Sequence, residues 1–239
     1  MTTKTGKKEQ VQDMFDNIAH RYDFLNHFLS AGIDRGWRRK MVKMIAKNKP
    51  TAVLDVATGT ADLAIALTKY TNSPITGIDI SKGMLDVGRD KIKKLGRSQQ
   101  IVLQQADSEK LPFSDGSFDV VMVAFGVRNF ETLDKGLAEM QRVLRPGGMV
   151  AILEFSRPRA FPIKQLYQFY FRFILPVLGR LISKDKAAYT YLPDSVGQFP
   201  DGQDFLKHLQ QTGYDKTHED KLSFGIATIY TGHKIMPGQ

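Results

Sequence analysis

Three aspartates lie in or next to short apolar segments of this 239-residue sequence, and together they could hold a ligand. Asp55 lies in the apolar run that begins at Ala52, Asp79 ends the next run, and Asp107 follows a third. A small-residue turn, Ala57–Ala61, leads from the first run directly into a helical pattern. The carboxyl ends of neighbouring strands line one crevice in an open parallel sheet, so the three carboxylates should converge there. The pattern predicts a nucleoside-cofactor site in which Asp79 binds the ribose hydroxyls and helix N–H groups approach the ligand.

The turn, Asp55-Val-Ala-Thr-Gly-Thr-Ala61, discriminates between cofactors. It differs from the dinucleotide fingerprint G-x-G-x-x-G because it holds one glycine, Gly59, where a pyrophosphate cradle needs several. Its acidic residue instead suits a ligand that carries an ammonium group. S-adenosylmethionine has such a group and a positive sulfonium, and Asp107 could accept a hydrogen bond from its adenine amino group. The turn therefore favours S-adenosylmethionine, while NAD and a purely structural turn stay open as alternatives.

The elements around these residues predict one α/β domain, residues 1–239. Its parts are an N-terminal helical cap (1–50), a cofactor-binding core (51–156), a helical substrate or lid region (157–212) and C-terminal strands (213–239). Apolar and amphipathic segments alternate in the core, which indicates βαβ units and a parallel sheet. The expected strands are Ala52–Ala57, Ile75–Ile80, Ile101–Gln105, Val120–Ala124, Met149–Phe155 and a β-type segment at Phe224–Lys234. The expected helices are Asp62–Tyr70, Lys82–Leu95, Leu133–Leu144, before the turn at Pro146-Gly-Gly, and Asp201–Gln211.

Composition limits the class of protein. The chain has no cysteine, which excludes disulfides, a thiol nucleophile and a cysteine-based zinc site, and no His–Asp–Glu spacing predicts a metal site. A formal net charge of +9 favours anionic partners, although a lysine-rich solvated surface would also explain it. No nucleic-acid motif accompanies the basic residues between Arg35 and Lys49, so nucleic acid is not the expected partner. The polar N-terminal segment lacks the apolar core of a signal peptide, and we expect a cytoplasmic protein.

One long apolar segment, Phe161–Ile182, could concern a membrane. It contains Lys164, Arg172, Arg180 and Pro176, so we do not expect it to span a bilayer. A core or lid helix and an interfacial, lipid-binding helix are both compatible with its composition.

Further stretches carry a resemblance to a known family. The region from Asp55 to the Leu-Pro-Phe-Ser-Asp-Gly-Ser-Phe-Asp run that ends at Asp119 resembles the class I methyltransferases. Tyr22–Trp37 and Arg142–Ser156 resemble the two signatures of the quinone-biosynthesis C-methyltransferases, and Phe125-Gly-Val-Arg-Asn129 matches their F-G-[IVL]-R-N. Along nearly its whole length the sequence is similar to the demethylmenaquinone / 2-methoxy-6-polyprenyl-1,4-benzoquinol C-methyltransferase family.

The resemblance implies a doubly wound, mostly parallel seven-stranded sheet of the Rossmann-like class I type, with N-terminal helices and a helical insertion near 157–212. It implies S-adenosylmethionine as cofactor and a polyprenylated quinol as acceptor. Demethylmenaquinol is the favoured acceptor; the benzoquinol of ubiquinone biosynthesis and another small molecule are alternatives. The turn is expected to be somewhat less open than in many relatives, which carry glycine at positions 57 and 61. The expected cofactor-binding residues are Asp55, Gly59, Thr60, Asp79, Asp107 and Ser108.

Methylation of a quinol carbon requires help for an adjacent hydroxyl to lose its proton. Arg128, just past a strand end, is the main candidate, because a guanidinium cannot act as a base but can stabilise a phenolate. An ordinary ion pair is the alternative for Arg128, and Glu154 could be a pairing partner or face the substrate. Asn129 could orient a quinol oxygen. The candidate proton acceptors in the N-terminal signature, a possible lid over the crevice, are His20, Tyr22, Asp23 and His27.

Asn26 and Trp37 are expected to pack or position other residues. A polyprenylated acceptor resides in the bilayer, so the resemblance also implies peripheral contact with the anionic inner face of the cell membrane. The basic N-terminal region and Phe161–Ile182 suit such a contact. A homo-oligomer and a non-catalytic S-adenosylmethionine-binding module remain open alternatives.

Overall fold

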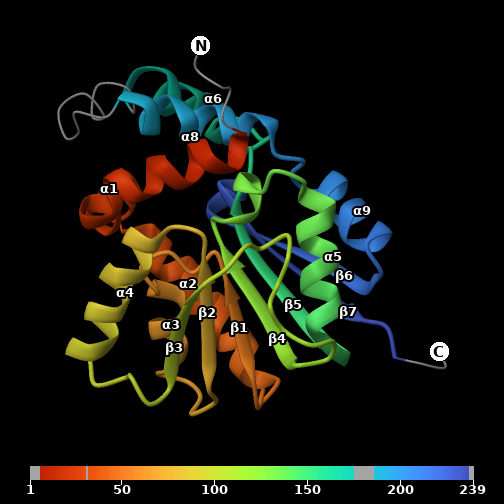
Figure 1. The fold of residues 1–239 in the computed structure, drawn as a ribbon. Helices are drawn as coiled ribbons and strands as arrows, with labels where there is room; N and C mark the ends of the chain where they lie inside the picture. The colour runs from red at the N-terminus through yellow and green to blue at the C-terminus, as the bar shows by residue number, and fades with distance from the viewer. Residues whose placement is uncertain (1–5, 31, 175–185, 237–239) are drawn as a thin grey trace.

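A seven-stranded sheet forms the centre of the protein (Figure 1). The computed structural model describes residues 6–30, 32–174 and 186–236. The strands are β1 (Val53–Val56), β2 (Ile75–Asp79), β3 (Ile101–Gln105), β4 (Phe118–Ala124), β5 (Leu144–Phe155), β6 (Tyr214–Leu222) and β7 (Ala227–Lys234). They lie in the order β3-β2-β1-β4-β5-β7-β6, and β7 is antiparallel to both of its neighbours. The predicted doubly wound, mostly parallel α/β sheet is therefore confirmed.

Helices cover both faces of this sheet because both faces are apolar. Successive side chains of a strand point to opposite sides. Val53 therefore packs in the cluster that includes α2, α3 and α4, and Leu54 in the cluster that includes α5 and α9. The described helices are α1 (Lys7–Leu29), α2 (Ile33–Lys47), α3 (Asp62–Leu67), α4 (Lys82–Lys94), α5 (Leu133–Val143), α6 (Ile163–Phe169), α8 (Lys186–Gln198) and α9 (Gln203–Gln211). Shorter helical turns are η1 (Val127–Asn129), η2 (Tyr170–Ile174) and η3 (Ser223–Gly225).

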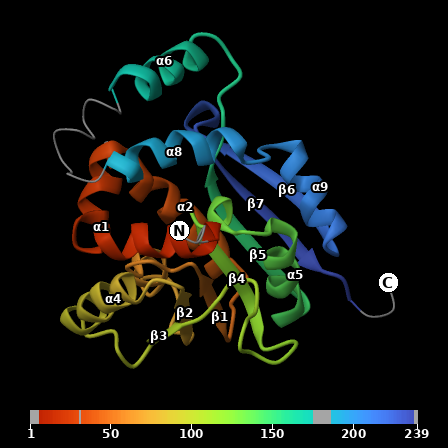
Figure 2. The ribbon, with the colours of Figure 1, turned by 45° about the horizontal axis from the view of Figure 1, so that its top comes forward.

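The register of the sheet brings the carboxyl ends of the parallel strands to one edge. Asp55 pairs with Gly77 of β2, and Asp79 pairs with Gln105 of β3. The chain winds outward from β1 to β3 and then returns to β4 on the other side of β1. A crevice forms at such a switch point because the loops after β1 and β4 diverge to opposite faces of the sheet. Figures 1 and 2 show α1 lying across this edge, with α6 and α8 beyond it.

Several predicted boundaries differ from the structure. The helix expected over Asp62–Tyr70 ends at Leu67, and β5 begins at Leu144 instead of Met149. The Pro-Gly-Gly segment lies inside β5 because the pairing with β4 shifts there, from Phe118–Leu144 to Val120–Met149. Such a bulge accommodates extra residues without ending a strand.

The segment Phe161–Ile182 falls only partly within the described residues. It begins with α6 and continues as the π-helical turn η2 up to Ile174, while 175–182 lie outside the part of the chain that is described. Among the helices of residues 6–30, 32–174 and 186–236, none combines the length and apolarity needed to cross a bilayer.

Candidate functional site

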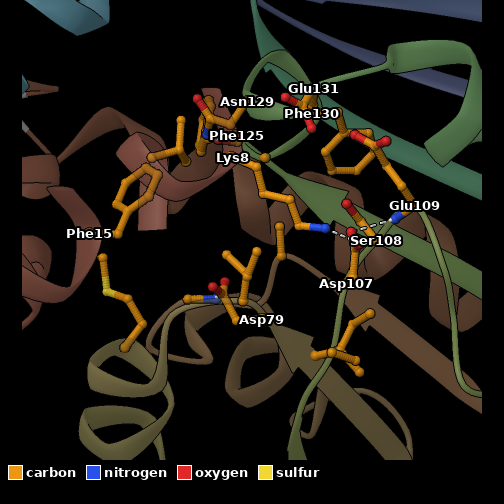
Figure 3. A pocket seen from close by; sticks show the side chains of 18 of the residues that line it. Lys8, Phe15, Asp79, Asp107, Ser108, Glu109, Phe125, Asn129, Phe130 and Glu131 are labelled. Atoms are coloured by element: carbon orange, nitrogen blue, oxygen red, sulfur yellow. Dashed lines mark hydrogen bonds and ion pairs between the residues drawn. The ribbon is translucent and has the colours of Figure 1, made fainter. Parts of the chain in front are cut away.

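The carboxyl-terminal edge of the sheet holds a cavity of about 710 Å³, including its open mouth. Its floor comes from the ends of β1, β2 and β3, one wall from the loop after β4, and its cover from α1. Figure 3 shows labelled side chains from α1, from the ends of β2 and β3, and from the loop after β4 around it. Its lining includes Lys8, Val11, Phe15, Tyr22, Ala57, Gly59, Ile78, Asp79, Met84, Ala106, Asp107, Ser108, Glu109, Phe125, Gly126, Asn129, Phe130 and Glu131.

Asp79 is held in place at the floor of this cavity. Its carboxylate accepts one hydrogen bond from the Gly59 N–H at 2.8 Å and another from the Ser81 N–H at 2.9 Å. Burial raises the pKa of Asp79, and these two N–H donors oppose the rise. A carboxylate oxygen can accept more than one hydrogen bond, so Asp79 retains acceptor capacity toward the cavity. Its position and chemistry suit a pair of ribose hydroxyls.

The turn after β1 reaches the cavity through its backbone. Ala57, Gly59 and Ala61 all have positive φ, at 51°, 55° and 66°. Such a conformation is unfavourable for alanine by about 1–2 kcal/mol, and only small side chains are tolerated there. The aromatic ring of Tyr22 lies near Gly59, where an added Cβ would be 3.8 Å from Tyr22 Cε1. Positions 57 and 61, where many relatives are expected to carry glycine, thus hold alanines in a strained backbone conformation.

Asp55 lies beneath this turn and is absent from the cavity lining. It is 1 % exposed and accepts a hydrogen bond of 2.6 Å from the Thr58 hydroxyl. Burial raises the pKa of Asp55 to about 7, although the bond from Thr58 opposes this rise. Thr60 is also buried, and its hydroxyl donates to Asp23 of α1. These two predicted cofactor residues therefore support the turn from below and from the side.

The raised pKa of Asp55 predicts a pH effect on stability. Burial favours the neutral acid, so the folded state binds a proton that the unfolded state releases above its ordinary pKa of 3.8. The contribution of Asp55 to the free energy of unfolding should therefore fall between about pH 4 and pH 7, by up to about 4 kcal/mol. We expect Asp55→Asn to make the decline of the unfolding free energy with pH shallower in this range, as measured by urea unfolding at a series of pH values.

Asp119 offers a control of opposite sign. Burial alone would raise the pKa of Asp119, but hydrogen bonds from Thr51, Ala52 and Arg145 lower this pKa to about 2. Its stabilising contribution is present above about pH 4 and is lost as the pH falls toward 2. Asp119→Asn should therefore lose stability at neutral pH. Parallel pH profiles for Asp55→Asn and the parent protein would contradict the assignment for Asp55.

Gly126 lets the loop after β4 approach the turn after β1. A Cβ at this position would lie 2.6 Å from Ala57 Cβ and 3.0 Å from Val123 Cγ1. Neither neighbour has a flexible end that could move away, so overpacking of about 1–3 kcal/mol is expected. We expect Gly126→Ala to lower the melting temperature and to weaken binding of S-adenosylhomocysteine, measured by calorimetry, at least about tenfold, because the displaced turn carries Gly59.

Gly36 provides the matched substitution for this experiment. It lies in α2, and an added Cβ there would meet nothing within 4 Å. Gly36→Ala should leave binding unchanged and stabilise the helix by up to about 1 kcal/mol. If Gly126→Ala and Gly36→Ala had equal effects on binding, the close approach of the two loops could not be the cause of the weaker binding.

Asp107 and Ser108 form the wall after β3. Asp107 pairs with Lys8 of α1, and its other oxygen accepts from the Glu109 N–H at 2.9 Å (Figure 3). Partial burial would raise its pKa, but these hydrogen bonds outweigh burial and hold the pKa of Asp107 below its usual value. The carboxylate is therefore ionised and available to accept from an amino group. Lys8 stands beside it in the cavity and would have to share or release Asp107.

Helix α1 is fastened over the cavity by half-buried polar contacts that sequence reasoning missed. Asp16 accepts from the Gly83 N–H at 2.8 Å and from the Ser81 hydroxyl, at the N-terminus of α4. Lys91 of α4 pairs with Asp23 at 2.6 Å and also with Asp62 of α3. Asp23, predicted as a proton acceptor, is thus engaged by Lys91 and Thr60. The sequence predicted an N-terminal helical cap over residues 1–50, but no local signal specified which helix α1 would contact.

The remaining candidates of the N-terminal signature differ in placement. Tyr22 lines the cavity, and its ring contacts Phe15 edge-on with 5.7 Å between centroids. His20 is exposed to solvent. The side chains of Asn26 and His27 lie outside the described part of the structure. Trp37 is 6 % exposed and packs against Phe125, as expected of a positioning residue.

Arg128 lies beside a second cavity, between η1 and α8. Its guanidinium pairs with Glu154 Oε1 at 2.9 Å, and the two side chains are 7 % and 0 % exposed. Burial raises the pKa of Glu154, while the charge of Arg128 opposes that rise. Asn129 joins the two cavities: it lines the first, and its Oδ1 accepts a hydrogen bond of 3.0 Å from Tyr191, which lines the second. Tyr191 was not singled out in the sequence because its helix showed no motif.

The described residues hold no cluster of three or more His, Asp or Glu side chains that could bind a metal ion. The site is thus one of carboxylates, backbone N–H groups, small-residue turns and a buried arginine. This donor set suits an organic, partly cationic ligand with hydroxyl and amino groups.

Solved structures place the fold in a class. A structure of an S-adenosylmethionine-dependent methyltransferase from Thermotoga maritima has a TM-score of 0.66 at 16 % identity, covering 93 % of this chain and 99 % of that one. The [4+2]-cyclase SpnF is as similar, with a TM-score of 0.67 at 16 % identity and coverage of 97 % and 98 %. The chain has the fold of class I methyltransferases, and the cyclase shows that the fold alone does not specify the reaction.

Sequence comparison gives the family. The model of the ubiE/COQ5 methyltransferase family matches residues 2–234, and the chain belongs to this family. The demethylmenaquinone methyltransferase of Bacteroides fragilis is 48 % identical over 231 residues, 96 % of this chain and 94 % of that protein. The ubiquinone/menaquinone biosynthesis C-methyltransferase UbiE of Geotalea daltonii is 50 % identical over 232 residues, with coverage of 96 % and 98 %.

Proposed function

We propose that this protein transfers a methyl group from S-adenosylmethionine to a ring carbon of a polyprenylated quinol, with demethylmenaquinol as the acceptor. The observation that carries the proposal is the junction of two cavities at Asn129, one built for a nucleoside and the other flanked by a buried arginine. The activities named for the relatives in Bacteroides and Geotalea support the same reaction.

The residues of the first cavity fit the donor. Asp79 would bind the ribose hydroxyls, and Asp107 with Ser108 would bind the adenine amino group. The turn at Gly59 approaches without a side chain, which leaves its backbone free to face the amino-acid tail. Asp55, buried beneath the turn, would act on that tail only through the turn that it supports. A bound S-adenosylmethionine supplies an electrophilic methyl group, and its leaving group needs no protonation.

The residues of the second cavity would prepare the acceptor. A quinol hydroxyl has an ordinary pKa of about 10, so loss of its proton at neutral pH needs a nearby cation. Arg128 would stabilise the resulting phenolate, whose electrons make the adjacent ring carbon nucleophilic. When that carbon gains the methyl group, its own hydrogen leaves as a proton.

Asn129 would orient the quinol. Tyr191 donates to Asn129 Oδ1, and the side-chain amide of Asn129 donates one of its two N–H groups to the Phe125 carbonyl oxygen at 3.4 Å. The second N–H of this amide would be the donor to a quinol oxygen. Tyr22, in the lining of the first cavity, is the candidate to relay the proton to solvent, accepting it on its hydroxyl oxygen while releasing its own, because Asp23 is engaged by Lys91.

The decisive experiment incubates the protein with isotope-labelled S-adenosylmethionine and each of two quinols, demethylmenaquinol and 2-methoxy-6-polyprenyl-1,4-benzoquinol. Mass spectrometry of the product should show one labelled methyl group on the quinol ring. Methylation of the benzoquinol alone would replace the proposed acceptor. Methylation of neither would refute quinol methylation, and calorimetry with S-adenosylhomocysteine and NAD would then establish whether the nucleoside site is correct.

A further inference from the structure

Exposed aromatic side chains gather beside the site. Phe161 and Phe224 are 82 % and 81 % exposed, and Leu166, Phe169 and Phe173 are between 54 % and 61 % exposed. Residues 166, 169 and 173 recur at helical spacing, and the rings of Phe169 and Phe173 lie 5.2 Å apart. The aromatic surface is defined here as Phe161, Leu166, Phe169, Phe173 and Phe224.

The topology brings the parts of this surface to one edge of the molecule. Strand β6 runs parallel to β5, since β7 is antiparallel to both, so η3 with Phe224 follows the same edge as the carboxyl ends of β1–β5. The segment before α6 contacts η3: Ser156 donates to the Gly225 carbonyl at 2.9 Å, and Arg159 and Phe224 line a common hollow. Figures 1 and 2 show α6 standing out from the body of the protein on this side.

The charged residues between positions 157 and 184 are all positive. This part of the sequence contains six basic residues and no Asp or Glu. Lys164 and Arg172 are exposed between the aromatic side chains, and the Arg172 guanidinium lies 5.6 Å from the centre of the Phe173 ring. A short helix with exposed aromatic residues and flanking cations has the composition of helices that lie in the interface of anionic bilayers.

We propose that the aromatic surface binds the headgroup region of an anionic lipid bilayer, with its rings among the outer acyl carbons and Lys164 and Arg172 at lipid phosphates. The inference rests on the proposed function, because a polyprenylated quinol is dissolved in the bilayer and must reach the second cavity from there. Contact on this side turns the carboxyl-terminal edge of the sheet, and with it the site, toward the membrane.

The test is co-sedimentation of the full chain with phosphatidylcholine vesicles, with and without phosphatidylglycerol, at low and high salt. The parent protein should bind the anionic vesicles, more weakly at high salt. The double variant Phe169→Ser/Phe173→Ser should have a partition coefficient into anionic vesicles at least about tenfold lower than the parent, because the apolar contact of each ring with lipid is lost. Lys164→Gln/Arg172→Gln should remove most of the salt dependence.

Matched variants separate this surface from general exposure and charge. Leu95→Ser/Val102→Ser changes two other exposed apolar residues, at 57 % and 61 % exposure, and should bind vesicles like the parent. Lys43→Gln/Lys47→Gln changes the basic helix α2 and should also have little effect. Loss of binding in the α2 variant with normal binding in the Phe169/Phe173 variant would overturn the proposal, as would equal binding of all variants.

Two further measurements keep this proposal separate from the proposed reaction. The Phe169/Phe173 variant should bind S-adenosylhomocysteine with parental affinity, which verifies its fold. Methylation of a short-tailed, water-soluble quinol should also be unchanged in it. If the parent methylates no quinol but binds anionic vesicles through α6, the reaction is wrong and the membrane surface stands; the reverse result refutes only the surface.

Discussion

Asp79→Ala should weaken binding of S-adenosylhomocysteine by at least about a hundredfold. Hydrogen bonds to a charged group contribute about 1.5–3 kcal/mol each, and in the proposed site Asp79 would accept two from the ribose. The carboxylate also holds the turn after β1 through the Gly59 N–H, so its removal loosens a second part of the donor site. Isothermal titration calorimetry measures the affinity directly, and a thermal melt establishes that the variant is folded.

Two further substitutions locate the source of that loss. Asp79→Asn keeps one oxygen acceptor and should bind with intermediate affinity, because it retains shape and part of the hydrogen bonding. Asp90→Ala removes an exposed carboxylate from α4 without touching the cavity and should bind like the parent. Parental affinity in Asp79→Ala would exclude Asp79 from the donor site.

Arg128→Ala should lower kcat with the quinol by about a hundredfold to a thousandfold, the range seen when a group that stabilises an oxyanion is removed. Binding of S-adenosylhomocysteine should change little, because Arg128 lies outside the lining of the first cavity. The substitution also leaves Glu154 buried without its ion-pair partner, which costs about 3–5 kcal/mol of stability. Steady-state kinetics on protein verified as folded is therefore the required measurement.

A double variant separates the loss of the cation from the loss of stability. In Arg128→Met/Glu154→Gln neither side chain is charged, so most of the stability should return. Turnover should stay low if the positive charge of Arg128 is what the quinol needs. Recovery of turnover in the double variant would show that Arg128 serves only to pair with Glu154, the structural alternative that its sequence position left open.

The strands and the strand-end acids could be predicted because their signals are local. A buried parallel strand is a short apolar run, and its last residue marks the edge where ligands bind. Asp79 and Asp107, singled out in this way, line the cavity. The same rule does not say which side of the strand end a carboxylate faces. It therefore could not predict that Asp55 lies under the turn, where it accepts a hydrogen bond from Thr58.

An N-terminal lid over the site could be proposed from the sequence, but the contacts that fasten it could not be predicted, because they join residues far apart in the chain. Lys8 pairs with Asp107, and Lys91 joins α1 to α3 and α4. A lysine on the polar face of an amphipathic helix has the same local pattern whether it meets solvent or a carboxylate. The pairing of Arg128 with Glu154 was foreseen only as an alternative, since Arg128 follows β4 and Glu154 lies near the end of β5, 26 residues further along the chain.

The fastening of α1 has a consequence for ligand exchange. Its contacts span 123 residues from Lys7 to Phe130 and 99 from Lys8 to Asp107, whereas the Gly59–Asp79 bond spans 20. Lys8 and Asp107 are 36 % and 30 % exposed, so water can replace each partner at a cost of at most about 1 kcal/mol. Sub-global opening can therefore lift the first turn of α1 while the floor of the cavity stays folded, and a ligand can leave without global unfolding.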